Sequence, residues 1–445
     1  MAELQFFSQS ARDSDNLTGS TSRLVNLYPE PTVGGAMWLK SVLGADDHAQ
    51  LPGVFVRAMA EIGGRLYAAC GGSLVLVNAD GSYTVLGSID DSEDCTISGN
   101  NGDVLCVSGG KYYRWDGATL TQPSAGAFSA FGSVTYLANY SILAERGGRM
   151  IQWSDLADAS DLPGLNFATA DGRDDAIVRV MAINGALWVF KETSREVWYH
   201  TEQAGPDAFL RMAGGIYDVG LAGHGLIAQI PASAFLVGSD GRAHLVNGNG
   251  LQPVSTPPVE TAIKTCHPEY CLTYEDEGHT FCAIVFRDCP AWVYDVATGQ
   301  WHERAEGVDL EPWSVAVSAQ WNGAWYVGRS TGMISKLSRS NADGYIPLVR
   351  EATSHTMRQD GRRFTIWEFE AWMRRGFASG SASLSVSRDG GVTWGTLRAR
   401  DIGPVGNYDG RVIWRNLGQF RQATARLRWT DGDDVSVSSV GRVRL

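Results

Sequence analysis

Apolar and polar residues alternate along most of this chain, in units of about 40 residues that are built around glycine-containing turns. In one unit, apolar residues fall at every second position at Leu187 and Val189, and again after a break at Val197 and Tyr199. A period of two residues predicts half-buried β-strands. The clearest units begin at Gly63, Asn101, Asn184, Ala232, Gly278 and Asn322.

The turns between these strands carry Asp-Gly pairs, in which glycine readily adopts the positive φ that tight hairpins require. No segment has the pattern of a long helix. The 52 glycines and 15 tryptophans suit stacked four-stranded blades, with glycine in the turns and large rings between the blades. The sequence therefore predicts an all-β chain with a β-propeller of six blades, and residues 131–156 have the right length for a seventh.

The repeat divides the chain into three parts. It is absent from residues 1–50, it runs through residues 51–345, and after residue 345 it gives way to longer alternating segments at 364–373, 382–389, 411–418 and 423–430. We expect residues 51–345 to form the propeller and residues 346–445 a β-sandwich-like domain. Residues 1–50 are expected to form an extended segment that packs on the C-terminal domain.

Charge separates the same regions. Residues 346–445 contain 16 arginines, no lysine and 10 acidic residues, a formal charge of +6, whereas residues 1–345 carry −18 of the total of −12. Arginine without lysine favours bidentate pairing with carboxylates or phosphates, so the C-terminal domain suits docking on an acidic surface. A basic but merely solvated β-domain is the alternative.

The composition also bears on where the protein works. There is no apolar run of 18 residues, so no membrane-spanning helix is expected. The first 20 residues lack the pattern of a secretory signal. Seven cysteines without a regular spacing favour reduced thiols in a cytoplasmic product.

One turn motif stands in the C-terminal domain. Ser387, Asp389, Gly391, Thr393 and Trp394 make the pattern S-x-D-x-G-x-T-W, which resembles the Asp-box of sialidases. In an Asp-box the Ser and Asp side chains bond turn amides and the Trp anchors the hairpin, so we expect a structural role.

Other candidate sites are weaker. A Cys/His cluster could hold zinc, but its spacing is irregular and Cys282 lies in an apolar strand, so we expect no metal. Two acidic groups could hold calcium but match no EF-hand loop. His224 has no nucleophile motif beside it, and the turn at 248–250 and four tryptophans are better explained by hairpins and inter-blade packing. The residues concerned are Cys266, His267, Cys271, His279, Cys282 and Cys289; Asp90, Asp91, Glu93 and Asp94 with Asp431, Asp433 and Asp434; and Trp292, Trp301, Trp313 and Trp321.

The N-terminal segment carries the most specific string. Arg23, Asn26, Tyr28, Pro29 and Glu30 lie in the string RLVNLYPE, which resembles the opening of the packaged-DNA stabilisation proteins of short-tailed phages. Those proteins are tail hub, or nozzle, subunits. The resemblance extends in outline to a central propeller and an arginine-rich C-terminal β-domain.

The resemblance implies a structural virion protein in the phage tail, assembled in the host cytoplasm, with neither active site nor cofactor. It implies a homo-oligomeric ring, a hexamer, that docks beneath the portal and adaptor with tail fibres nearby, extends the channel for double-stranded DNA, and retains the packaged genome until ejection. An acidic propeller would let DNA slide without specific binding. The N-terminal string, together with Arg374 and Arg375, would then belong to the docking platform.

Two other classes stay open. A sialidase-like glycan-active enzyme needs arginines for a sugar carboxylate and a tyrosine with a paired acid inside the propeller, whereas the 16 C-terminal arginines lie outside the predicted blades. A propeller that binds glycans or proteins without catalysis is the second alternative.

Overall fold

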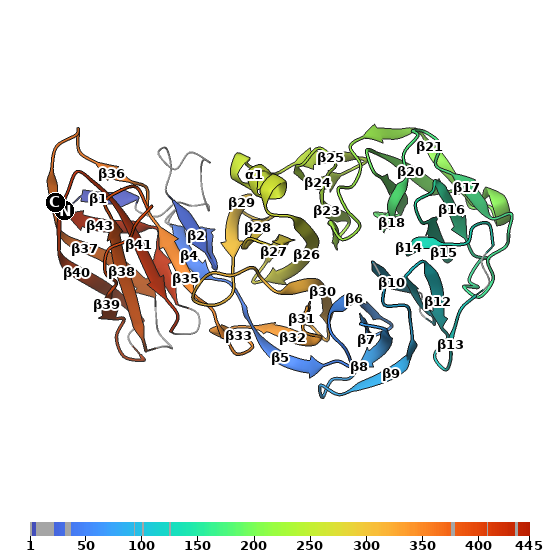
Figure 1. Ribbon diagram of the computed structural model, residues 1–445, viewed down its shortest axis with the longest axis horizontal. Helices are drawn as coiled ribbons and strands as arrows, with labels where there is room; N and C mark the ends of the chain where they lie inside the picture. Colours follow the sequence, from blue (N-terminus) through green and yellow to red (C-terminus); the bar gives the residue numbers. More distant parts are fainter. Residues whose placement is uncertain are drawn as a thin grey trace.

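The computed structural model describes residues 2–5, 22–31, 37–92, 94–99, 102–123, 126–374, 379–406, 408–431 and 435–445. It is an elongated two-domain molecule in which a ring of small sheets lies beside a compact pair of larger sheets (Figure 1). The N- and C-termini lie together at the far end of the second domain.

The ring is a β-propeller with seven four-stranded antiparallel blades, so the fold prediction is confirmed and residues 131–156 do contribute a blade. The first three blades are β6 (Val56–Ile62), β7 (Arg65–Cys70), β8 (Ser73–Val77) and β9 (Tyr83–Ser88); β10 (Cys95–Gly99), β11 (Val104–Ser108), β12 (Lys111–Trp115) and β13 (Leu120–Thr121); and β14 (Phe131–Leu137), β15 (Tyr140–Glu145), β16 (Met150–Trp153) and β17 (Phe167–Thr169). The next two are β18 (Ile177–Ile183), β19 (Ala186–Lys191), β20 (Ser194–His200) and β21 (Phe209–Asp218), with the short helix η1 (Gly205–Asp207) before β21; and β22 (Ile227–Ile230), β23 (Ser233–Val237), β24 (Ala243–Asn247) and β25 (Gly250–Pro253).

The helix α1 (Pro257–Thr265) leads into the sixth blade, β26 (Pro268–Asp276), β27 (His279–Phe286), β28 (Ala291–Asp295) and β29 (Gln300–Arg304). The seventh blade has β30 (Val315–Trp321), β31 (Ala324–Arg329) and β32 (Met333–Ser338), and its fourth strand is β5 (Gly44–Gln50). Among the described residues, no helix is long and apolar enough to cross a membrane.

Strand β5 closes the ring without a covalent bond. It pairs antiparallel with β32 over a register from Ser338 opposite Gly44 to Met333 opposite Gln50, and the short strand β33 (Ala342–Asp343) pairs with its other edge and with β34 (Ile346–Pro347). The structure therefore differs from the expectation that residues 1–50 form one segment on the C-terminal domain, because Gly44–Gln50 is part of the propeller. The hydrogen bonds between β5, which directly precedes the first blade, and β32 of the seventh blade hold the first and last blades together.

Small hydroxyl side chains bind the inner strands of neighbouring blades to one another. The Val134 amide donates to Thr96 Oγ1 and the Val180 amide to Ser133 Oγ, each at 3.0 Å, and Ser318 Oγ donates to the Thr273 carbonyl at 2.6 Å. Short side chains let the strands approach closely around the axis.

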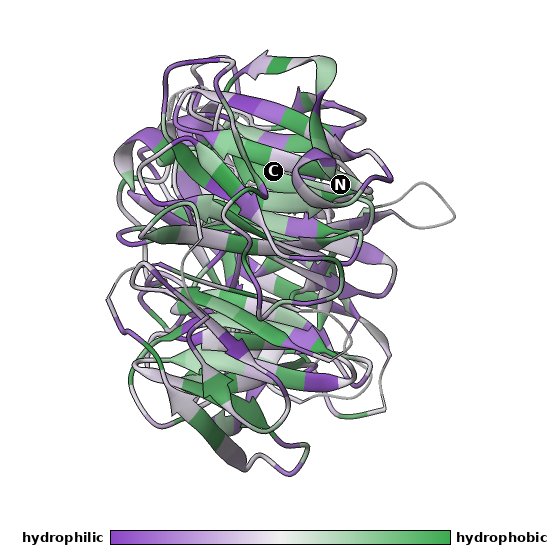
Figure 2. Ribbon diagram, turned by 90° about the vertical axis from the view of Figure 1, so that its right-hand side faces the viewer, coloured by the Kyte–Doolittle hydropathy of each residue, from purple (hydrophilic) through white to green (hydrophobic). Residues whose placement is uncertain are grey.

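Large rings fill the space between blades farther out. Trp301 Nε1 donates to the Val254 carbonyl of the preceding blade at 2.8 Å, and Trp321 Nε1 donates to the Gly64 carbonyl of the first blade at 3.1 Å. Trp292, Trp301, Trp313 and Trp321 are at most 5% exposed. The inter-blade role expected for these tryptophans is confirmed for Trp301 and Trp321. Figure 2 shows hydrophobic and hydrophilic residues mixed along the strands, as expected for half-buried strands.

The second domain is a β-sandwich. One sheet contains β1 (Ala2–Gln5), β43 (Val440–Arg444), β37 (Phe364–Arg374), β42 (Ser436–Ser438), β4 (Met37–Ser41) and β3 (Leu27–Pro31), with β40 (Asp409–Phe420) paired to β37. The other contains β2 (Arg23–Val25), β35 (Arg350–Thr353), β41 (Gln422–Trp429), β38 (Ser381–Ser387) and β39 (Arg398–Asp401), with β36 (Met357–Arg358) paired to β41. Buried residues of the two sheets, including Phe369, Trp414, Leu384 and Leu427, form one core.

The closing strand gives a direct test of the domain boundary. A fragment of residues 51–345 lacks β5 and leaves the seventh blade with three strands, whereas a fragment of residues 43–348 retains β5, β33 and β34. We expect the longer fragment to unfold at a midpoint at least 10 °C higher in thermal denaturation followed by circular dichroism, because the shorter ring is open. Equal midpoints would show that β5 does not hold the ring closed.

Candidate functional site

The N-terminal string singled out by the sequence lies where the two domains meet. Strand β2 pairs in parallel with β29 of the sixth blade, Val25 opposite Glu303, and antiparallel with β35 of the sandwich. The sixth blade and one sandwich sheet therefore form a single ten-stranded sheet with β2 inside it. Figure 1 shows β2 between the ring and the sandwich.

Asn26 ends β2 and turns the chain toward β3. Its φ is +57°, a left-handed conformation that asparagine adopts more readily than most residues. Its fully buried side chain donates to the carbonyls of Ala305 at 2.9 Å and Val349 at 2.7 Å, and accepts from the Ala305 amide at 3.0 Å. One side chain thus bonds the segment after the sixth blade and the segment before β35, which makes Asn26 the hydrogen-bonding centre of the junction.

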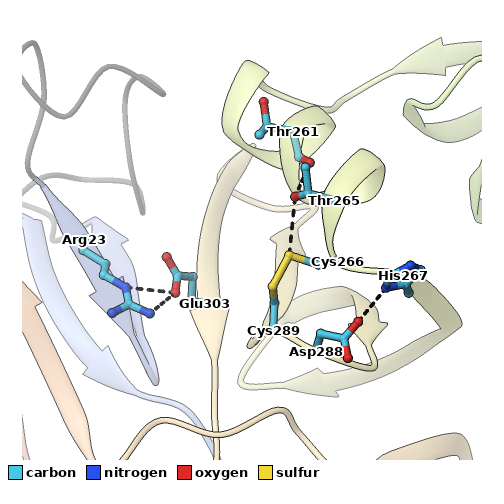
Figure 3. The surroundings of a disulfide bond; sticks show 8 residues. All are labelled: Arg23, Thr261, Thr265, Cys266, His267, Asp288, Cys289 and Glu303. Carbon is cyan, nitrogen blue, oxygen red and sulfur yellow. Dashed lines mark hydrogen bonds and ion pairs between the residues drawn. A yellow bond between two sulfur atoms is a disulfide. The ribbon is translucent and has the colours of Figure 1, made fainter.

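Arg23 adds an ion-pair network to this junction. Its Nε and Nη2 donate to Glu303 Oε2 at 2.9 and 2.5 Å (Figure 3). Arg23 Nη1 lies 4.0 Å from Glu351, and Arg428 pairs with Glu351 at 3.4 Å. Burial acts to lower the pKa of Arg23, but the two glutamates outweigh burial and raise it. Arg23 is therefore held as a cation that joins blade and sandwich.

The following residues anchor β3 on the sixth blade. Tyr28 is fully buried, and its ring packs edge-on against His279 and Phe281 at centroid distances of 5.2 and 5.0 Å. Glu30 Oε2 lies 3.0 Å from His279 Nε2, and Asp295 lies 2.8 Å from Nδ1 of the same ring. Pro29 is buried between them along the strand.

The structure differs from the prediction that the N-terminal string forms a docking surface. Arg23, Asn26, Tyr28, Pro29 and Glu30 contact other parts of the same chain, and the buried members offer no surface to a partner. The string lies in two short strands with no period that shows which side faces inward. Asn26, Tyr28 and Pro29 are buried within the chain, whereas a docking role for the partly exposed Arg23 and Glu30 stays a prediction.

Arg374 is exposed at the end of β37, and Arg375 lies outside the described residues. Beside Arg374, the outer face of β37, β40 and β43 carries charged pairs, with Glu368 Oε2 2.9 Å from Arg415 and Glu370 Oε2 3.3 Å from Arg411. Trp367 is 55% exposed on the same strand, and with Arg415, Arg444 and Leu445 it lines a hollow of about 390 Å³. We call the outer face formed by Trp367, Arg374, Arg411, Arg415, Arg442 and Arg444 the basic sandwich face.

The Asp-box-like residues form a local turn between β38 and β39. Ser387 Oγ accepts from the Gly391 amide at 2.8 Å, and Asp389 accepts from the Thr393 amide at 2.9 Å. The hydrogen bonds that Ser387 and Thr393 give it lower the pKa of Asp389. Trp394 is half-buried, with the Arg426 guanidinium 4.1 Å from its ring centre. These contacts are structural.

The residues of the Cys/His cluster make separate contacts and do not converge on one site. Cys266 at the end of α1 and Cys289 in the loop before β28 form a disulfide (Figure 3), so the expectation that all seven cysteines are reduced is wrong for this pair. Their separation of 23 positions along the sequence gave no signal of a disulfide. Cys271 and Cys282 are buried thiols whose pKa burial raises. His267 pairs with Asp288 (Figure 3).

The remaining candidates do not form a chemical site among the residues described. No group of three or more metal-ligating side chains occurs in that part of the chain. Asp90 accepts from Ser92 and pairs with Lys111, and Asp431 accepts from the Ser381 amide, as solvated turns do. Glu93, Asp433 and Asp434 lie outside the described residues, and Gly248 and Asn249 form the hairpin between β24 and β25. His224 lines the axial cavity of the propeller.

Sequence reasoning also missed a buried charge network near the junction. Arg304 and Asp343 are 3.1 Å apart, Arg329 and Glu306 are 2.7 Å apart, and all four are at most 5% exposed. The Arg304 guanidinium lies 3.8 Å from the ring centre of Trp313. These pairs link the outer strand of the sixth blade to the strands around β5.

Two family models cover nearly all of the chain. The one described as bacteriophage P22 Gp10, beta-propeller, matches residues 8–341, and the one described as bacteriophage P22 Gp10, beta-sandwich, matches residues 350–443. The chain belongs to the bacteriophage P22 Gp10 family. It is a structural protein of a short-tailed phage tail and hence of the virion, as the resemblance of its N-terminal string implied. No curated protein matches the sequence.

Solved propeller structures are similar at low identity. U3-55K has a TM-score of 0.46 at 9% identity over 66% of this chain and 98% of that one, and the RRP9 WD40 repeats have 0.47 at 9% over 69% and 99%. PorZ of Porphyromonas gingivalis has 0.42 at 11% over 72% and 44%. These similarities carry no argument about function.

The role of Asn26 is testable by substitution. Asn26→Ala loses three buried hydrogen bonds. It also places alanine, which adopts a positive φ less readily than asparagine, at this position, so we expect a loss of about 4 kcal/mol in the free energy of unfolding. Urea denaturation followed by tryptophan fluorescence measures it. Asn139→Ala is the matched control, because Asn139 also has a positive φ, +66°, but is exposed, and it should cost about 1 kcal/mol. Equal effects would remove Asn26 from the centre of the junction.

Proposed function

We propose that this chain is a subunit of the ring-shaped tail hub, or nozzle, that lies below the portal and adaptor of a short-tailed phage. In this role a ring of six copies extends the DNA channel, retains the packaged genome and lets it pass during ejection. The observation that carries the proposal is the match of both domains, in order, to one phage tail family. The fusion of the two domains into one sheet suits a subunit that bears load between a docking platform and a distal ring.

The charge distribution supports the orientation we propose. The first 345 residues carry a formal charge of −18, and negative walls repel the phosphate backbone, so DNA slides past without binding. The sandwich, at +6 over its last 100 residues, is the part that docks on an acidic surface of the adaptor complex. The propeller then points away from the head.

The basic sandwich face is the surface we assign to this docking. Exposed arginine and tryptophan are the residue types most enriched among residues that dominate binding energy, and both occur there. Several other C-terminal arginines form hydrogen bonds within the chain. Arg350 is buried and donates to the Thr430 carbonyl, and Arg388 donates to the Gln419 carbonyl. On the basic sandwich face, Arg411 and Arg415 pair with glutamates but stay exposed to solvent, and Arg374 is exposed at the end of β37, so these guanidinium groups can reach a partner.

Charge reversal tests the docking surface. Arg374→Glu combined with Arg375→Glu is expected to reduce attachment to purified adaptor complexes at least tenfold in a pull-down, since like charges then face one another. Arg65→Glu, at the exposed start of β7 in the first blade, should attach like the wild-type chain. Unchanged attachment of the double variant, with its circular dichroism spectrum intact, would exclude these two arginines from the interface.

Immunogold labelling of whole particles tests the location. Gold at the tail end of short-tailed particles is expected. Label on free protein alone, with unlabelled tails, would contradict a hub role.

A further inference from the structure

The propeller encloses an axial cavity of about 590 Å³ that the tail role does not use. One end of it is formed where the inner strands begin, and residues from five blades meet there. They are Phe55 of the first blade, Asp94 of the second, Arg179 of the fourth, His224 before the fifth and Tyr270 of the sixth. We call this end of the cavity the axial mouth.

Arg179 is the residue at the axial mouth whose charge is least compensated. Its Nη1 donates to the His224 carbonyl at 3.0 Å, and its Nε is buried without a hydrogen-bond partner. Among the described residues, no carboxylate forms an ion pair with Arg179. Burial lowers its pKa to about 10, with Asp94 opposing that effect. Arg179 is partly buried, and a guanidinium that is partly removed from water and makes no ion pair is unfavourable, so an anion entering the cavity gains from pairing with it.

The neighbours of Arg179 do not provide that partner. Asp94 is 61% exposed, and its Oδ2 lies 3.7 Å from His224 Nδ1, so its carboxylate stays at the solvent edge of the mouth. Burial and the charge of Arg179 lower the pKa of His224 to about 3, which leaves the imidazole neutral. Arg57, which also lines the cavity, donates to the carbonyls of Gly71 and Asp90.

Two further features suit a binding site. Phe55 has a φ of +70°, a strained conformation for a bulky residue and of a kind that clusters at ligand sites. Its ring lies 5.9 Å from that of Tyr270, which gives the mouth an apolar wall opposite the charged residues. Convergence of a few polar groups on a partly apolar cavity is the usual composition of a small-molecule site.

We propose that the axial mouth binds one small oxoanion, a phosphate or a carboxylate, through the Arg179 guanidinium. The bound anion accepts hydrogen bonds from the edge of the guanidinium that faces the cavity, and Asp94 weakens binding by its negative charge. Phosphate and the carboxylate of an acidic sugar share this chemistry and both fit the volume. The proposal is independent of the hub role, because it concerns the ring axis of a single chain.

Isothermal titration calorimetry of the full chain tests the site, with inorganic phosphate in one series and glucuronate in the other. We expect saturable binding with one site per chain for at least one of them, and the tighter probe identifies the source. Arg179→Gln should weaken binding at least tenfold. Arg173→Gln is the matched control, since Arg173 belongs to the same blade's surface and pairs with Asp218 in solvent.

A second variant keeps the test decisive if Arg179→Gln does not fold. Asp94→Asn removes an exposed charge and should tighten binding severalfold. The absence of saturable binding to the wild-type chain would overturn the proposal. So would binding that is unchanged by Arg179→Gln, or that is unchanged or weakened by Asp94→Asn.

Discussion

The pairing of β2 with both domains is the constraint on which the arrangement of this molecule depends. Three residues of β2 complete a sheet that begins in the sixth blade and ends in the sandwich, and Asn26 then bonds main-chain groups on both sides of the boundary. Main-chain hydrogen bonds across a shared sheet allow little rotation, unlike a flexible linker. The propeller and the sandwich are therefore one mechanical unit.

The closing strand extends the same principle to the ring. The chain passes through β3 and β4 of the sandwich and then forms β5, which completes the seventh blade. The N-terminal segment therefore both joins the two domains and closes the propeller. The buried pairs of Arg304 with Asp343 and Arg329 with Glu306 lie where these paths meet. Opening the ring would expose these charges without their partners, which is costly. In the hub role proposed above, a subunit that retains the genome until ejection would benefit from a ring that opens only as a whole.

Much of this architecture was predictable, because each blade has a recognisable pattern within its own stretch of sequence. Alternation, turn glycines and tryptophans repeat within each unit, so the propeller, its seventh blade at 131–156 and the sandwich followed from the sequence. β2 and β5 were not predictable from such patterns. β5 reads GADDHAQ, a polar string, and its pairing with β32 depends on a segment almost 300 residues away. The burial of Asn26, Tyr28 and Pro29 between the two domains was not predictable for the same reason, since a short string does not show which other segments its residues contact.

Electron cryomicroscopy of the intact particle tests the central claim most directly. The account predicts six copies of the chain around a channel that continues the portal axis, with the sandwich toward the head and the propeller distal. A tail reconstruction in which this chain is absent from the channel wall would contradict the hub assignment. The reverse orientation, with the propeller on the adaptor, would contradict the electrostatic argument for docking.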